Sequence, residues 1–87
     1  MPKIKKKTIE IERVQTGIRI ERRLLKVLKG LSEYLYVSLG DLLEGIVLHT
    51  FDAKSPFSNE TLSKIRDLKR IYALDLDSSA SHRMHEL

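Results

Sequence analysis

The sequence contains no cysteine, and no apolar run in its 87 residues approaches the length of a membrane-spanning helix. The first absence excludes disulfides and thiolate metal sites and is compatible with a reducing compartment. The second, with no signal-peptide core near the start of the chain, leads us to expect a soluble cytoplasmic protein. A chain this short forms one small domain, whose core is marginal unless another subunit adds to it.

Catalytic motifs are also missing. The sequence has no Ser/His/Asp arrangement, no glycine-rich phosphate loop and no His-Glu-x-x-His helix. So short a chain also has little room for a concave substrate pocket. His82 and His85 have a spacing that metal-binding pairs use, but no cysteine supports them and they lie in a predicted loose tail. We therefore expect neither an enzyme nor a bound metal or cofactor.

Positive charge is concentrated near the start of the chain. The net charge is +4, but residues 1–30 hold ten Lys and Arg against three Glu, whereas residues 31–87 hold six against nine acids. Self-repulsion among the first lysines predicts a flexible basic arm over residues 1–12. This asymmetry favours a polyanionic partner such as nucleic acid, although a solubilising surface would show the same composition.

An alternating pattern follows the arm and predicts a β-strand over residues 14–20. One face of this strand carries Val14, Thr16, Ile18 and Ile20, and the other carries Arg13, Gln15, Gly17 and Arg19. A lone strand leaves a row of backbone N–H and C=O groups exposed. We expect it to pair antiparallel with the same strand of a second chain around a two-fold axis.

Three helices are predicted after the strand. Apolar residues at helical spacing indicate an amphipathic helix over 21–35. Ser38 as N-cap, with Asp41 three residues on, predicts a second helix over 39–51. Its apolar residues cover most of its circumference, which indicates burial between subunits. A third helix over 59–73, capped by Ser58 or Asn59, precedes a flexible tail over 75–87.

The order strand, helix, short turn and capped helix in "VQTGIRIERRLLKVLKGLSEYLYVSLGDLLEGIVLHTF" resembles the ribbon-helix-helix family, the MetJ/Arc/CopG superfamily of repressors. The resemblance covers residues 13–51, with 52–74 as an added loop and third helix. It implies a mainly α fold with one N-terminal β-strand. It also implies an intertwined homodimer, in which a two-stranded antiparallel ribbon between the chains enters the DNA major groove.

The resemblance also implies site residues. Base contacts fall to Gln15, Gly17 and Arg19, with Arg13 at the end of the same face. Phosphate contacts fall to the backbone amides near Ser38, Leu39 and Gly40, at the positive end of the second helix. Further phosphate candidates are Arg22 and the arm residues Lys5, Lys6 and Lys7. The predicted dimer core consists of Ile18, Ile20, Leu24, Leu28, Leu42, Leu43, Ile46 and Val47.

The leading functional hypothesis is a sequence-specific double-stranded DNA-binding dimer, associated with the nucleoid, that represses transcription. Two positions depart from the family pattern: Gly17 offers no side chain to a base, and Glu21 puts a negative charge near the presumed DNA surface. One alternative is an antitoxin-type interaction module whose C-terminal region binds a partner protein. Another is a homodimeric scaffold without sequence-specific DNA binding.

Overall fold

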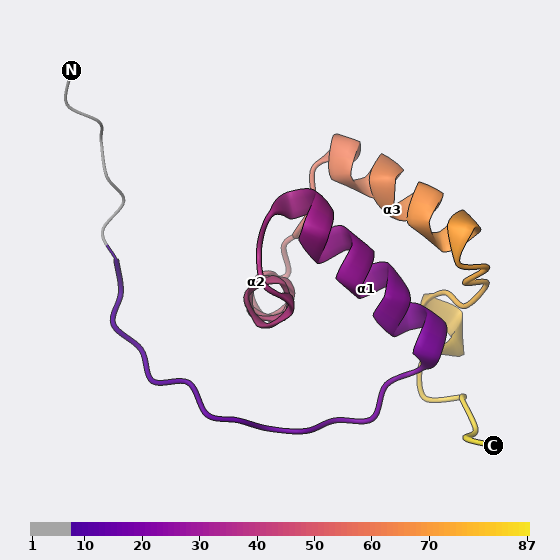
Figure 1. Ribbon diagram of the computed structural model, residues 1–87, viewed down its shortest axis with the longest axis horizontal. Coiled ribbons are helices and arrows are strands. Elements are labelled where there is room, and N and C mark those ends of the chain that lie inside the picture. Colours follow the sequence, from indigo (N-terminus) through magenta and orange to yellow (C-terminus); the bar gives the residue numbers. More distant parts are fainter. Residues whose placement is uncertain (1–7) are drawn as a thin grey trace.

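The computed structural model describes residues 8–87, which form three α-helices and one short 3-10 helix (Figure 1). The bounds are α1 Arg22–Leu35, α2 Leu39–Phe51, α3 Asn59–Ile71 and η1 Ser78–Ala80. Helices α1 and α3 run side by side, and α2 crosses on the other side of α1 (Figure 1). Residues 8–20, here called the extended segment, form a long arm that leads away from the N-terminal end of α1 (Figure 1).

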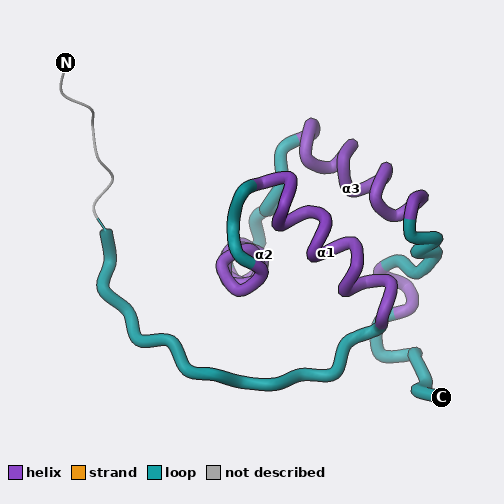
Figure 2. The backbone as a smooth tube through the Cα atoms, viewed as in Figure 1, coloured by secondary structure: helices purple, strands orange, loops and turns teal. Residues whose placement is uncertain are grey.

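The predicted β-strand over residues 14–20 is absent. Figure 2 draws the extended segment as loop, and residues 8–87 contain no strand or sheet. The predicted fold class, a ribbon-helix-helix arrangement with an N-terminal strand and an intermolecular ribbon, is therefore wrong, because the described chain is all-helical. Alternation gives a segment two faces, but a strand also needs ladder hydrogen bonds to a neighbour. Within residues 8–87 the backbone of the extended segment has no such partner.

The starts of the helices follow from local capping. The Glu21 carboxylate accepts a hydrogen bond from the Leu24 amide at 2.9 Å and so caps α1. The Ser38 hydroxyl accepts one from the Asp41 amide at 3.1 Å, which confirms the predicted cap of α2. Ser58 caps α3 in the same way. The helices predicted over 21–35, 39–51 and 59–73 are confirmed to within two residues at each end.

The sharp turn between α1 and α2 is made by Tyr36 in the left-handed conformation, with φ 57°. The amide of Val37 donates to the carbonyl of Ser32 at 3.0 Å, which satisfies a carbonyl at the end of α1. This turn reverses the chain and lets α2 pack across α1 after only three residues.

The core is small and lies on both sides of α1, the helix that contacts each of the other two. Its buried apolar residues are Val27, Leu31, Leu42, Leu68 and Leu74. Leu31 is the most deeply enclosed of them, at 2% exposure. Within residues 8–87, no helix combines the length and the apolar character needed to cross a bilayer.

Residues 75–87, here called the C-terminal segment, return toward the start of α1 (Figure 1). Leu74 is buried just before it and anchors its origin in the core. The Arg23 side chain, in the first turn of α1, donates from Nη1 to the Ala73 carbonyl at 2.9 Å and to the Asp75 carboxylate at 3.0 Å. The C-terminal segment therefore lies beside the N-terminal end of α1, where the extended segment joins the helix.

Candidate nucleic-acid interface

The four residues predicted to contact bases all lie on the extended segment, and all are exposed. Because residues 8–87 contain no strand, these residues do not lie on the face of a sheet. Instead, Arg13 and Arg19 each bind a carboxylate from a distant part of the chain. Between them, the Gln15 side chain has no hydrogen-bond partner within residues 8–87, and nothing lies within 4 Å of a Cβ built on Gly17.

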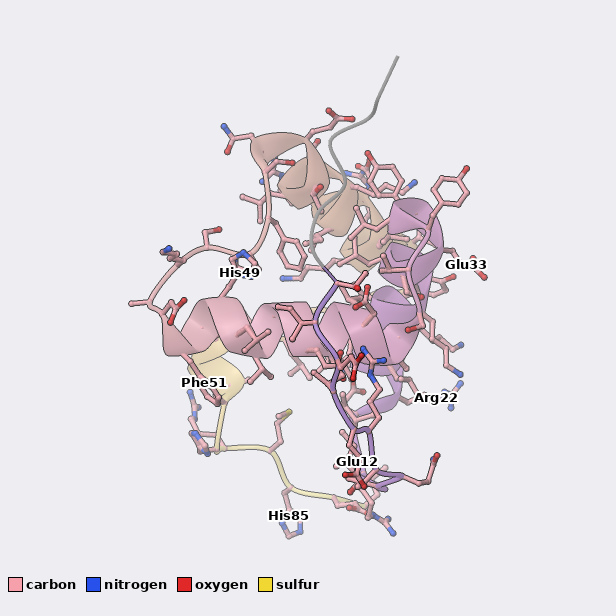
Figure 3. All side chains as sticks on the ribbon, turned by 90° about the vertical axis from the view of Figure 1, so that its left-hand side faces the viewer. Glu12, Arg22, Glu33, His49, Phe51 and His85 are labelled. Atoms are coloured by element: carbon pink, nitrogen blue, oxygen red, sulfur yellow. The ribbon has the colours of Figure 1, made fainter. Side chains whose placement is uncertain are left out.

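Arg13 attaches the extended segment to α2. Its Nε donates to Glu44 Oε2 at 2.8 Å and its Nη2 donates to Glu44 Oε1 at 2.7 Å, so the pair is bidentate. This hydrogen bonding lowers the pKa of Glu44 and raises the pKa of Arg13. Asp41, in the first turn of α2, also favours the charged form of Arg13. Figure 3 shows the extended segment passing in front of α2, with Glu12 labelled on it.

Sequence reasoning did not identify Glu44. One signal could have found it, because Asp41 and Glu44 are the two acids on an otherwise largely apolar helix. A carboxylate on such a helix is expected to bind a cation, and here the cation is Arg13, 31 positions earlier in the sequence. Spacing along the sequence gives no indication of a contact at that range.

Arg19 binds the C-terminal segment. Its Nε donates to Glu86 Oε1 at 3.2 Å and its Nη2 contacts Glu86 Oε2. Both side chains remain well exposed, at 83% for Arg19 and 64% for Glu86, so the pair is weak and screened by salt. The predicted base-reading arginine is thus within reach of solvent but is already paired with an anion.

The N-terminus of α2 is open. The Ser38 hydroxyl satisfies the Asp41 amide, and within residues 8–87 the amides of Leu39 and Gly40 have no acceptor. No atom lies within 4 Å of a Cβ built on Gly40. Backbone amides at the positive end of a helix dipole form a site suited to a phosphate oxygen. Because Arg13 is hydrogen-bonded to Glu44, in the first half of α2, this helix end lies near the extended segment.

The other cations predicted to meet phosphate have different positions. Arg22 is exposed in the first turn of α1, directly after the extended segment (Figure 3). Lys5, Lys6 and Lys7 lie outside the described residues. Arg23, which sequence reasoning did not single out, pairs with Glu21 at 3.2 Å and with Asp75 at 3.0 Å. It stabilises the chain's own fold and is not a free phosphate contact.

The residues predicted to form a dimer core divide into two groups. Leu42 is buried within the single chain, and the half-buried members are Ile20, Leu24, Leu28, Leu43 and Ile46. Ile18 and Val47 are exposed, at 71% and 44%. Leu48 is exposed as well, and so is Phe51 at the C-terminal end of α2 (Figure 3). The chain therefore retains an apolar surface along α2 that its own helices do not cover.

An apolar cavity of about 370 Å³ lies between α1, α3, the C-terminal segment and Ile46 of α2. Its walls include Leu24, Leu28 and Ile46 from the predicted dimer core, and Leu76 and Met84 from the C-terminal segment. The tail predicted to be loose thus shares a cavity with residues predicted to meet a second chain.

His82 and His85 are exposed on the C-terminal segment (Figure 3 labels His85). Among residues 8–87 they belong to no group of three or more His, Cys, Asp or Glu side chains that could hold a metal ion. The polar groups gathered near the extended segment are guanidiniums, carboxylates and helix amides, of which the guanidiniums and amides can bind an anion and the carboxylates repel one. Comparison of the chain with protein-family models, with curated proteins and with solved structures gives no match.

Proposed function

We propose that this chain binds double-stranded DNA as a homodimer and acts as a transcriptional repressor. The observation that carries the proposal is the extended segment, whose Arg13, Gln15 and Arg19 side chains are exposed on a backbone without internal partners. Arg bonds two acceptors on guanine and Gln bonds two groups on adenine, which makes these residue types suitable for base contact. The resemblance of residues 13–51 to DNA-binding repressors agrees with this proposal, although residues 8–87 do not form the strand of that family.

The dimensions of the extended segment suit a nucleic-acid groove. Arg13 and Arg19 are six positions apart, so an extended backbone separates them by up to about 20 Å. One turn of B-DNA rises about 34 Å, so the two guanidiniums would span more than half a turn. The acceptor atoms of guanine bases would replace the carboxylates of Glu44 and Glu86 as the partners of these arginines. The lysines that precede the segment in the sequence add charge of the same sign.

The N-terminus of α2 would hold one phosphate. The free amides of Leu39 and Gly40 supply two donors, and the helix dipole favours an anion there. Such a contact fixes the position of the protein on DNA without reading sequence. In this arrangement the extended segment supplies specificity and α2 supplies register.

A second copy of the chain would cover the apolar surface of α2. Val47, Leu48 and Phe51 are exposed on one short helix, and a contiguous exposed apolar patch is typical of an interaction surface. A two-fold dimer would place two extended segments on one duplex and predicts a palindromic site. Such dimers, acting at the nucleoid in the cytoplasm, would repress by occluding a promoter.

The test is a salt-dependent DNA-binding titration with matched variants. It compares the chain's own upstream DNA with a scrambled duplex of equal length, for wild type, Arg19→Ala and Arg66→Ala. Arg66 is an exposed cation on α3 with no ion pair within residues 8–87, so its removal controls for lost charge. We expect wild type and Arg66→Ala to prefer the upstream DNA. Arg19→Ala should lose about 1–3 kcal/mol of that preference.

Two outcomes contradict the proposal. Equal, weak binding to both duplexes that disappears as salt rises would mean that positive charge alone attracts DNA. No binding to either duplex would favour the alternative in which residues 52–87 bind a partner protein.

A further inference from the structure

The C-terminal segment occupies the groups that DNA binding requires. Glu86 binds Arg19, the second of the two arginines of the proposed reading segment. Asp75, at the start of the same segment, binds Arg23 in the first turn of α1. Between these two ion pairs lies a hollow lined by residues 19–23 on one side and 84–87 on the other. An acidic side chain therefore stands where a phosphate or a guanine edge would stand in the complex.

The same segment also covers apolar surface. Leu76 and Met84 line the cavity of about 370 Å³ whose opposite wall includes Leu24 and Leu28 of α1. Leu76 is half-buried there and packs against the core. Met84 is only partly covered, at 55% exposure. The contact is thus apolar but shallow, and it lies on the side of α1 that carries the predicted dimer core.

We propose that the C-terminal segment is an autoinhibitory cap. In the free chain its Glu86 neutralises Arg19 while Leu76 and Met84 cover Leu24 and Leu28, and the segment leaves this position when DNA binds. This inference rests on the proposed function, because it assigns a regulator to the same surface. The cap acts by direct competition: one anion, the Glu86 carboxylate, occupies the guanidinium that a DNA anion would otherwise bind.

The weakness of the contact is what makes the cap reversible. The Arg19–Glu86 pair is exposed on both sides, and exposed pairs contribute little to stability. A duplex offers many phosphates at once, so it can outcompete a single carboxylate. Leu74 stays buried in the core, so displacement of the segment beyond it leaves the helical fold in place.

The first arm of the test compares two full-length variants that lose the same charge. Glu86→Gln removes the anion opposite Arg19. Glu33→Gln removes an exposed anion on α1 that has no ion pair within residues 8–87 and lies far from the C-terminal segment (Figure 3). Both variants gain the same general attraction for DNA. We expect Glu86→Gln to bind the upstream duplex about two- to fivefold more tightly than Glu33→Gln, the range of an exposed ion pair.

The second arm of the test measures directly whether the C-terminal segment stays packed against α1. The chain has two methionines, Met1 and Met84, so methyl-labelled methionine gives two NMR signals. We expect the Met84 methyl signal to move to its unfolded-peptide position when wild type is saturated with the upstream duplex. Leu76→Ser, which removes the half-buried anchor, should move the same signal without DNA.

The cap requires both results. Equal affinity of Glu86→Gln and Glu33→Gln, or a Met84 signal that stays in place at saturating DNA, overturns it even if wild type binds the duplex. Failure of wild type and of Glu86→Gln to bind either upstream or scrambled DNA overturns the cap together with the proposed function. Binding of the duplex by wild type or by Glu86→Gln therefore separates a failure of the cap from a failure of the proposed function.

Discussion

Gly30 of α1 faces Leu68 of α3 so closely that a Cβ at position 30 would lie 2.9 Å from Leu68 Cδ2. Leu68 is buried, so its side chain has little freedom to move aside. The absence of a side chain at Gly30 is thus what lets the two helices approach. The cost of a glycine inside a helix is offset by the burial of Leu68.

Gly30→Ala should destabilise the chain. Alanine gains about 1 kcal/mol of helix propensity, but overpacking against a buried leucine costs about 1–3 kcal/mol, so a net loss near 1 kcal/mol is expected. Gly45→Ala is the matched control, because nothing lies within 4 Å of a Cβ at Gly45 and the change should stabilise by about 1 kcal/mol. Urea denaturation measures both. A stabilised Gly30→Ala would show that α3 does not pack on α1 at this point.

Ser38→Ala and Ser58→Ala should separate stability from DNA binding. Each removes a hydroxyl that caps a helix, so each should cost about 1 kcal/mol of unfolding free energy. Only the α2 cap lies at the proposed phosphate site, so only Ser38→Ala should also weaken DNA binding. Thermal unfolding and the DNA titration, run side by side, give the two quantities. Equal loss of affinity in both variants would place the phosphate contact elsewhere.

The stability of the chain should fall in acid partly through Glu21. The hydrogen bond from the Leu24 amide lowers the pKa of Glu21 below its ordinary value of 4.5, and Arg23 lowers it further. A carboxyl group with a lowered folded-state pKa stabilises the fold above its ordinary pKa. That contribution is lost as the pH falls from about 4.5 through the lowered value. Glu21→Gln should therefore show a flatter decline of unfolding free energy over this range.

NMR titration of the Glu21 carboxyl carbon provides the independent check. A midpoint at or above 4.5 would mean that the cap of α1 is not formed in solution. The same experiment reports on Glu44, whose pKa is lowered by its hydrogen bonds to Arg13. A lowered midpoint there would establish that the extended segment is held against α2.

Val47→Ser should weaken self-association. Val47 is 44% exposed on α2, and covering such a side chain contributes about 1.5–3 kcal/mol at most. A two-fold interface would contain it twice, so the dimer should dissociate at clearly higher protein concentration. Ile71→Ser, which changes an exposed isoleucine on α3, is the control. Sedimentation equilibrium measures both, and equal behaviour of the two variants would exclude the α2 face as the dimer surface.

The helices could be predicted because their signals are local. Ser38 and Ser58 cap helices within three residues of themselves, and the apolar spacing of residues 21–35 marks the face of α1 that meets the core. Tyr36 was the exception, since a left-handed tyrosine has no strong sequence signal. Its neighbour Ser38 still indicated where α2 starts.

The extended segment and the ion pairs could not be predicted in the same way. Alternation over residues 14–20 describes side chains, whereas a strand depends on a backbone partner that lies outside the segment. The pairs Arg13–Glu44 and Arg19–Glu86 join positions 31 and 67 residues apart. No regular spacing of charged residues connects positions so far apart in the sequence. The sequence therefore indicated the arginines but not the carboxylates that bind them.

The arrangement of α2 and α3 on α1 bears on how the chain opens. Each packs on α1, and their backbones do not approach one another closely within the described chain. Either helix can then detach while the other stays docked, so local opening should come in two separate steps. Amide hydrogen exchange in α3 and in α2 would proceed at different rates, with α1 the slowest because both openings must occur before it is free. A helical chain of this size would thus contain two independently opening parts that share one rigid centre.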